Sequence, residues 1–202
     1  MPLRRLLCRW PVFALVTGQF ASAWTLYVLM SWLPSYFREV QGLDIANAGL
    51  FSAAPWLAMA VAINLAASLS DRMIRGGMNV TSVRKLMQCG GLIASAGFLL
   101  ATRGAHTPAA ALMLLIGATG ALGVTWCGFA PGVLDIAPRH CGVMVGFTNT
   151  VGQIPGIVGV AVTGWLVDIT GTYSAAFVLA AAISVTGALV FGSLFSARQS
   201  IE

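Results

Sequence analysis

Long uncharged stretches alternate with short charged or Gly/Pro-containing segments along the whole chain. A helix rises about 1.5 Å per residue, so about 20 apolar residues cross the hydrocarbon core of a bilayer. The stretches are continuously apolar rather than alternating, which favours helices over barrel strands. We therefore predict an all-α membrane protein whose transmembrane helices lie at about 11–37, 47–70, 84–102, 108–131, 141–167 and 173–196.

Several details refine this prediction. Pro34 is expected to break or kink the first helix near its end, and Gly76-Gly77 indicates a turn within an inner loop at 71–83. The third span has the shortest uncharged stretch. Its membrane-crossing length includes Arg84 and Lys85, because their long side chains can reach the membrane surface. The first span is too long for a signal peptide and no cleavage site follows it, so we expect it to be retained.

The distribution of basic residues predicts the orientation. With the N-terminus inside, the outer side holds Arg38 and Arg103, whereas nine basic residues lie inside: Arg4, Arg5, Arg9, Arg72, Arg75, Arg84, Lys85, Arg139 and Arg198. This is a positive-inside pattern, and it places both termini on the cytoplasmic or equivalent side. It also accounts for the net charge of +5.

The composition agrees with a membrane protein and excludes other classes. Hydrophobic residues make up 58% of the chain and charged residues 8%, against about 25% charged residues in a soluble domain. The basic residues form no stripe with interleaved aromatic residues, so we expect no nucleic-acid partner. The four cysteines and two histidines have no metal-ligand spacing, so neither a metal nor a cofactor is expected.

The segment 141–167 carries small residues three or four positions apart, which places them on one face of a helix. In lipid, such a face lets another helix approach closely. Two interpretations stay open: a packing face alone, or a helix that slides beside a polar pathway. The residues concerned are Gly142, Gly146, Gly152 and Gly156, with Asn149, Gly159 and Thr163 on the same stripe.

Polar residues inside the spans are the candidates for a substrate path. We select Gln19, Ser22, Asn149 and Thr150, of which Gln19 and Ser22 share a helix face with Leu26. The alternative for each residue is a hydrogen bond between helices, worth about 0.6 kcal/mol. No paired carboxylate, nucleophile or metal cluster lies at membrane depth, so we do not expect an enzyme.

Five motifs occur in an order and spacing that resemble a known family: WLPSYF (32–37), SAAPW (52–56), SDRMIRGG (70–77), TSVRKLMQCGG (81–91) and DIAPRHCGVMVGFTNTVG (135–152). Together they resemble the C-terminal half of the anion/cation symporters of the major facilitator superfamily. That family includes vesicular glutamate transporters, sialin, sodium/phosphate cotransporters and plastid anion transporters. The sequence around SAAPW and VRKLMQ is most similar to that of the plastid members.

The resemblance implies a fold of twelve helices in two halves that moves by alternating access, with residues 1–202 as the C-terminal six-helix half. Asp71, Arg72 and Arg75 resemble the inner-loop conformational motif that contacts the opposite half, although Ala67 and Ile74 stand where that motif usually has glycine. The implied partners are a phosphate-like or small organic anion, a coupling cation (Na⁺ or H⁺), the lipid bilayer and the missing N-terminal half. The implied location is the plastid envelope or another organelle membrane, with the plasma membrane left open.

Two departures from the family pattern bear on the substrate. Family members often have a basic residue where this chain has Ser22, and Asn-His where it has Gly132-Val133. Both changes remove groups that could contact an anion, so glutamate is not carried over as the substrate. The alternative function is a non-transporting truncated fragment that pairs with another six-helix half.

Overall fold

A computed structural model describes residues 9–197, so the predicted inner charges at Arg4, Arg5 and Arg198 lie outside the described residues. Within that range the structure has six helices long and apolar enough to cross a membrane, and it has no strand. The prediction of an all-α membrane protein with six transmembrane helices is confirmed. The helices are α2 (Trp10–Glu39), α3 (Ile45–Arg75), α4 (Val80–Ala101), α5 (Pro108–Ile136), α6 (Cys141–Thr170) and α7 (Ser174–Leu194).

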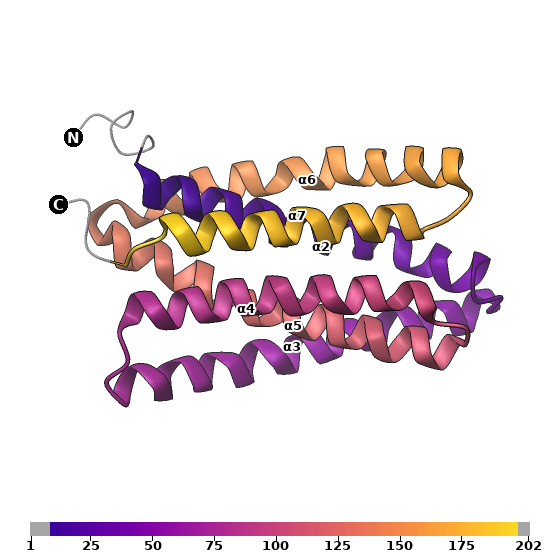
Figure 1. The fold of residues 1–202 in the computed structure, drawn as a ribbon, viewed down its shortest axis with the longest axis horizontal. Helices are drawn as coiled ribbons and strands as arrows, with labels where there is room; N and C mark the ends of the chain where they lie inside the picture. The colour runs from indigo at the N-terminus through magenta and orange to yellow at the C-terminus, as the bar shows by residue number, and fades with distance from the viewer. Residues whose placement is uncertain (1–8, 198–202) are drawn as a thin grey trace.

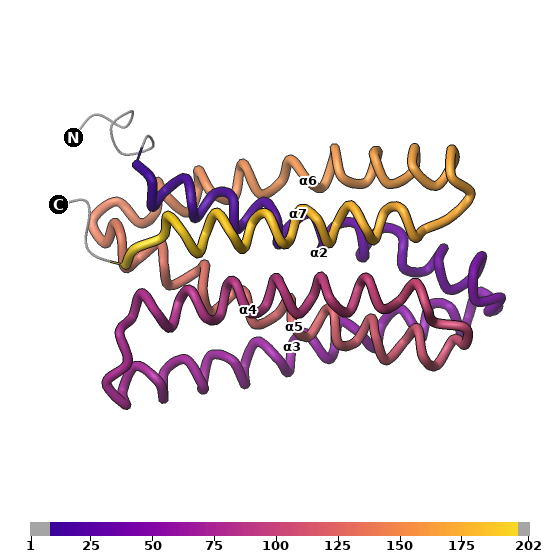
Figure 2. The backbone as a smooth tube through the Cα atoms, viewed as in Figure 1, coloured from indigo at the N-terminus to yellow at the C-terminus, as the bar shows by residue number. Residues whose placement is uncertain are grey.

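The helices run roughly side by side and are joined by short turns at the two ends of the bundle (Figures 1 and 2). Helix α2 contacts α3, α5, α6 and α7, and α4 packs on both α5 and α7. The start of α2, the α3–α4 turn, the α5–α6 junction and the end of α7 all lie at one end (Figure 1). That end carries most of the basic residues, which is the arrangement that the positive-inside pattern requires.

Local sequence explains where several helices begin and end. The Asn79 side chain accepts a 2.9 Å hydrogen bond from the Thr81 amide and caps α4, and Thr107 caps α5 immediately before Pro108. Gly171 ends α6 with a φ of 66°, and Gly77 has a φ of 90° in the α3–α4 turn. Glycine adopts this left-handed conformation at little cost.

One local prediction is wrong and one is wrong in part. Helix α2 continues through Pro34 to Glu39 without the predicted break, because a membrane helix tolerates the loss of one backbone hydrogen bond when neighbouring groups compensate, and a kink at Pro34 stays a prediction. The predicted inner loop at 71–83 is also wrong in extent. Helix α3 continues to Arg75 and α4 begins at Val80, which leaves a connection of residues 76–79.

The helices differ in how much of each is covered by the rest of the bundle. The most apolar part of α2 is 61% buried, whereas the corresponding parts of α3 and α6 are each 22% buried. Large apolar side chains on the outside include Leu57 and Leu65 of α3 and Ile157 of α6. Helix α2 is therefore an interior element, and α3 and α6 present broad apolar faces outward.

Candidate functional site

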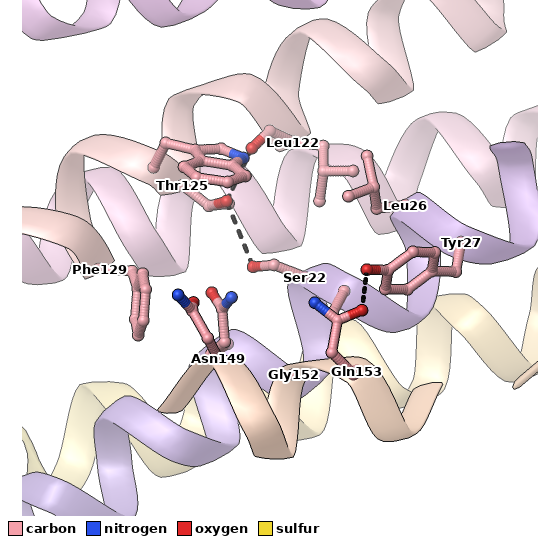
Figure 3. A pocket seen from close by; sticks show the side chains of 12 residues that line it. Ser22, Leu26, Tyr27, Leu122, Thr125, Phe129, Asn149, Gly152 and Gln153 are labelled. Atoms are coloured by element: carbon pink, nitrogen blue, oxygen red, sulfur yellow. Dashed lines mark hydrogen bonds between the residues drawn. The ribbon is translucent and has the colours of Figure 1, made fainter. Parts of the chain in front are cut away.

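A cavity of about 290 Å³ lies between α2, α5 and α6, near the middle of these helices (Figure 3). Twelve described residues line it, and none of them is charged. Its lining comprises Gln19, Ser22, Ala23, Leu26 and Tyr27 from α2; Leu122, Thr125, Trp126 and Phe129 from α5; and Asn149, Gly152 and Gln153 from α6.

Three of the four substrate-path candidates meet in this cavity. Gln19 and Ser22 lie on one face of α2 with Leu26, and Asn149 approaches from α6. Figure 3 shows Asn149 and Ser22 pointing toward the same space. Thr150 is not among the lining residues: its hydroxyl donates a 2.8 Å hydrogen bond to the Gly146 carbonyl of its own helix. A transport role for any of the four stays a prediction.

The cavity wall on α6 depends on close contact with α2. A Cβ added at Gly152 would lie 3.1 Å from atoms of the Gln19 side chain, and one at Gly156 would lie 3.4 Å from the Tyr27 ring. A Cβ at Gly142 or Gly146 would meet nothing within 4 Å. Within these six helices, the glycine face of α6 therefore approaches α2 at Gly152 and Gly156, and the packing role of the other two stays a prediction.

The floor of the cavity is a hydrogen-bonded chain across three helices. The fully buried Gln88 of α4 donates from Nε2 to Ser22 Oγ and to the Gly18 carbonyl, each at 3.2 Å. Ser22 Oγ donates to Thr125 Oγ1 at 3.2 Å, and Thr125 Oγ1 donates to the Leu122 carbonyl at 2.7 Å. Gln88 Oε1 has no hydrogen-bond partner.

Sequence reasoning did not select Gln88, although one signal was present. Gln88 follows Arg84 by four residues, so the two polar side chains share a face of α4. That face meets α5 at very close range, since a Cβ added at Gly128 would lie 2.7 Å from the Gln88 backbone nitrogen. The amide of Gln88 thus enters the bundle beneath Ser22.

The Arg84 side chain is held inside the bundle, and the prediction that it reaches the membrane surface stays a prediction. Its Nε donates to Asp135 Oδ2 at 2.9 Å, and its Nη1 donates to Ser70 Oγ at 3.1 Å and to the Cys127 carbonyl at 3.3 Å. The Arg84 side chain is 9% exposed and that of Asp135 is 24% exposed. A carboxylate on the neighbouring helix can hold the guanidinium inside, so the Arg84–Asp135 pair, with Ser70, joins α3, α4 and α5 at the end of the bundle that carries the α3–α4 turn.

The residues of the proposed inner-loop motif lie on the last turns of α3. Asp71, Arg72 and Arg75 are all exposed, and Arg75 Nε donates to the Asp71 carbonyl at 3.3 Å. Asp71 and Arg84 also line a second cavity, of about 350 Å³, at this end of the bundle. The contact of this motif with an opposite half stays a prediction.

At the end of the bundle opposite the α3–α4 turn, a tyrosine links two helices. Tyr173, between α6 and α7, donates a 2.8 Å hydrogen bond to Glu39 Oε2 at the end of α2. Burial, and secondly this hydrogen bond to a carboxylate, raise the pKa of Tyr173 to about 12. Nearby, Arg103 Nε donates to Ser174 Oγ at 2.8 Å.

The described residues do not bring together the groups that catalysis on a metal requires. Between residues 9 and 197, no three His, Cys, Asp or Glu side chains are placed to hold a metal ion. The central cavity instead offers neutral amides, hydroxyls and aromatic rings from three membrane-spanning helices.

Six membrane-spanning helices with a central polar cavity are typical of one half of a membrane transporter. The sequence profile of the Major Facilitator Superfamily matches residues 1–160, so this chain belongs to that superfamily. Its six helices are one half of the twelve-helix fold of that superfamily, and the chain is an integral, multi-pass membrane protein.

Comparison with curated proteins gives relatives from plants and animals. The chain is 32% identical over 201 residues to the ascorbate transporter, chloroplastic, of Arabidopsis thaliana, covering 100% of this chain and 37% of the relative. It is 31% identical to the sodium-dependent phosphate transport protein 1, chloroplastic, of the same organism, covering 100% and 39% respectively. It is 34% identical to vesicular glutamate transporter 3 of Danio rerio, covering 98% and 34%. The chain thus spans somewhat more than a third of the length of these relatives.

Proposed function

We propose that this chain is the C-terminal half of a secondary active transporter, which moves a phosphate-like or small organic anion together with Na⁺ or H⁺ by alternating access. The observation that carries the proposal is the cavity between α2, α5 and α6, in which Gln19, Ser22 and Asn149 meet near the middle of their helices. Substrate sites of such transporters lie near the bilayer midplane between the two halves. The names of the relatives support an anion as substrate.

The half would meet its partner through the surface around the cavity mouth. Asn149 and Gln153 are exposed on α6, and Trp126 of α5 is 42% exposed. Exposed amides are costly against lipid, so an N-terminal half would cover them and complete the site. Asp71, Arg72 and Arg75 would contact that half at the inner end.

Uptake measurements test the proposal. The chain is joined to the N-terminal half of a chloroplast relative, reconstituted in proteoliposomes, and supplied with labelled phosphate under a Na⁺ or a proton gradient. We expect gradient-dependent uptake that Asn149→Leu lowers by about tenfold or more, because the variant removes the hydrogen-bonding amide from the path. Asn64→Leu is the matched control, since Asn64 lies exposed on α3 and donates to the Ala60 carbonyl of its own helix.

The outcomes separate the two functions that the sequence left open. Uptake unchanged in Asn149→Leu removes this residue from the path. If a correctly folded pair of halves shows no uptake of phosphate or of an organic anion under either gradient, the chain is instead a non-transporting membrane fragment.

A further inference from the structure

A further cavity, of about 200 Å³, lies where α4 ends and α7 begins, at the end of the bundle opposite the α3–α4 turn (Figure 1). We call it the end cavity. It shares no lining residue with the central cavity between α2, α5 and α6. Its lining contains one charged residue, Arg103, and three aromatic rings, those of Tyr36, Tyr173 and Phe177. An aromatic cavity with a single cation favours an anionic ligand that also has apolar parts.

Arg103 lines the end cavity without an acidic partner. Its Nε donates to Ser174 Oγ at 2.8 Å, which fixes the plane of the guanidinium. Among the described residues, no carboxylate pairs with Arg103 and none accepts a hydrogen bond from its Nη groups. Glu39, which accepts from Tyr173, is paired with Arg38 at 3.0 Å and does not line the cavity. The Nη edge of Arg103 can therefore bind a ligand, and its planar pair of donors matches two oxygens of a phosphate group.

A second donor comes from a buried tyrosine. Tyr36 is 4% exposed, and its hydroxyl oxygen accepts a 3.1 Å hydrogen bond from Gln41 Nε2. Within the part of the chain that the structure describes, no group accepts the proton of that hydroxyl. A buried donor without an acceptor costs free energy, so an acceptor brought into the cavity would stabilise it. The lining thus offers a cation and a neutral donor to an anion.

Exposed apolar side chains continue from the end cavity toward the middle of the membrane. Leu100 precedes Arg103 by three residues and is 43% exposed, so it lies one turn deeper on the same face. Val178 follows Ser174 by four residues and is 38% exposed. The hydrogen bond between Arg103 and Ser174 joins the ends of these two faces. A ligand on Arg103 therefore has apolar surface beneath it on both helices, which an acyl chain would use and an inorganic anion would not.

We propose that the end cavity binds the phosphodiester of a membrane phospholipid. Arg103 Nη1 and Nη2 donate to two phosphate oxygens, the Tyr36 hydroxyl is a further donor, and an acyl chain lies along the exposed faces of α4 and α7. Pockets that enclose a drug-sized ligand measure roughly 300–1,000 Å³. The end cavity is smaller, at about 200 Å³, so it holds the phosphate region and leaves the rest of the lipid in the bilayer.

The location of the end cavity favours a lipid over a protein segment as its occupant. Basic pockets between membrane-spanning helices recognise lipid head groups. Helices α4 and α7 contribute no residue to the central cavity, so an N-terminal half that covers the mouth of that cavity would leave their exposed faces against lipid. The lipid site goes beyond the proposed function and does not depend on it.

Native mass spectrometry of the 202-residue chain in detergent tests which part of the lipid is recognised. The chain is titrated with palmitoyl-oleoyl phosphatidylglycerol, with the diacylglycerol of the same acyl chains, which lacks the phosphate, or with glycerol phosphate, which lacks the chains. The phospholipid should bind at least about tenfold more tightly than either, because the site uses both parts. Equal binding of diacylglycerol would show that the phosphate is not recognised. Equal binding of glycerol phosphate would show that the ligand is a free phosphate ester, and either result overturns the lipid site.

Matched variants locate the phosphate. Arg103→Gln should weaken the tightest phospholipid site by about tenfold, because it removes the cation and the pair of Nη donors. Arg38→Gln is the control: it removes the same charge at the same end of the bundle, from an exposed residue that does not line the end cavity, and should leave that site unchanged. Tyr36→Phe keeps the ring and removes the hydroxyl, so it should weaken the site by about threefold to tenfold. If Arg103→Gln binds the phospholipid as tightly as Arg38→Gln does, the phosphate is bound elsewhere and the proposal is wrong.

Discussion

Arg84 shows at the level of single residues how a charge is retained inside an apolar bundle. Its guanidinium is bound by Asp135, Ser70 and the Cys127 carbonyl. Arg84→Met leaves the partly buried Asp135 without its partner, and we expect it to destabilise the protein by about 1–3 kcal/mol. Lys85→Met is the control, because it removes a neighbouring charge for which the structure shows no ion pair with Asp135. Thermal unfolding in detergent measures both, and equal melting temperatures would contradict a structural role for the Arg84 pair.

Tyr173 predicts how the stability of the protein changes at high pH. Its pKa is raised to about 12, from an ordinary value near 10, so folding favours the neutral phenol. This contribution to stability is complete below about pH 10 and is lost as the pH rises toward about 12. The near-ultraviolet absorbance of tyrosinate, taken as the difference between the parent and Tyr173→Phe, should show the late titration. Glu39→Gln removes the carboxylate acceptor and should move that titration to lower pH; no movement would leave burial as its sole cause.

At the scale of helices, close packing is decided by which glycines face another backbone. A Cβ at Gly128 of α5 would lie 2.7 Å from the Arg84 carbonyl oxygen and from the Gln88 backbone nitrogen. Gly128→Ala must therefore push α4 and α5 apart, at a cost of about 1–3 kcal/mol. Gly146→Ala lies inside α6 at an exposed position, where the added Cβ meets nothing within 4 Å, so it should be neutral or stabilising by up to about 1 kcal/mol, as in a helix interior. Chemical or thermal unfolding that ranks the two variants in the opposite order would contradict this packing.

Comparing the helices with the sequence shows which features could be predicted and which could not. The spans follow from the length of apolar runs, and the meeting of Gln19 with Ser22 follows from helical periodicity. Thr150 is a candidate because it is a polar residue inside a span, but it does not line the cavity and its hydroxyl bonds to the Gly146 carbonyl, since successive helix residues point about 100° apart. The burial of Gln88 and Arg84 was not predicted, because it depends on the approach of α5 to α4. Periodicity in one helix does not specify its neighbours.

At the scale of the whole molecule, the cavity opens through a polar surface that lipid cannot satisfy. Asn149 and Gln153 are exposed on α6, a helix whose most apolar part is 22% buried. Unsatisfied amides in hydrocarbon cost several kcal/mol each, so the isolated chain should cover this surface by self-association or unfold readily. Size-exclusion chromatography with light scattering in detergent should show oligomers or a low melting temperature, and co-expression with an N-terminal half should yield a discrete one-to-one complex of higher stability. A monodisperse, thermally robust monomer that gains nothing from the second half would show that the polar mouth is satisfied within these six helices.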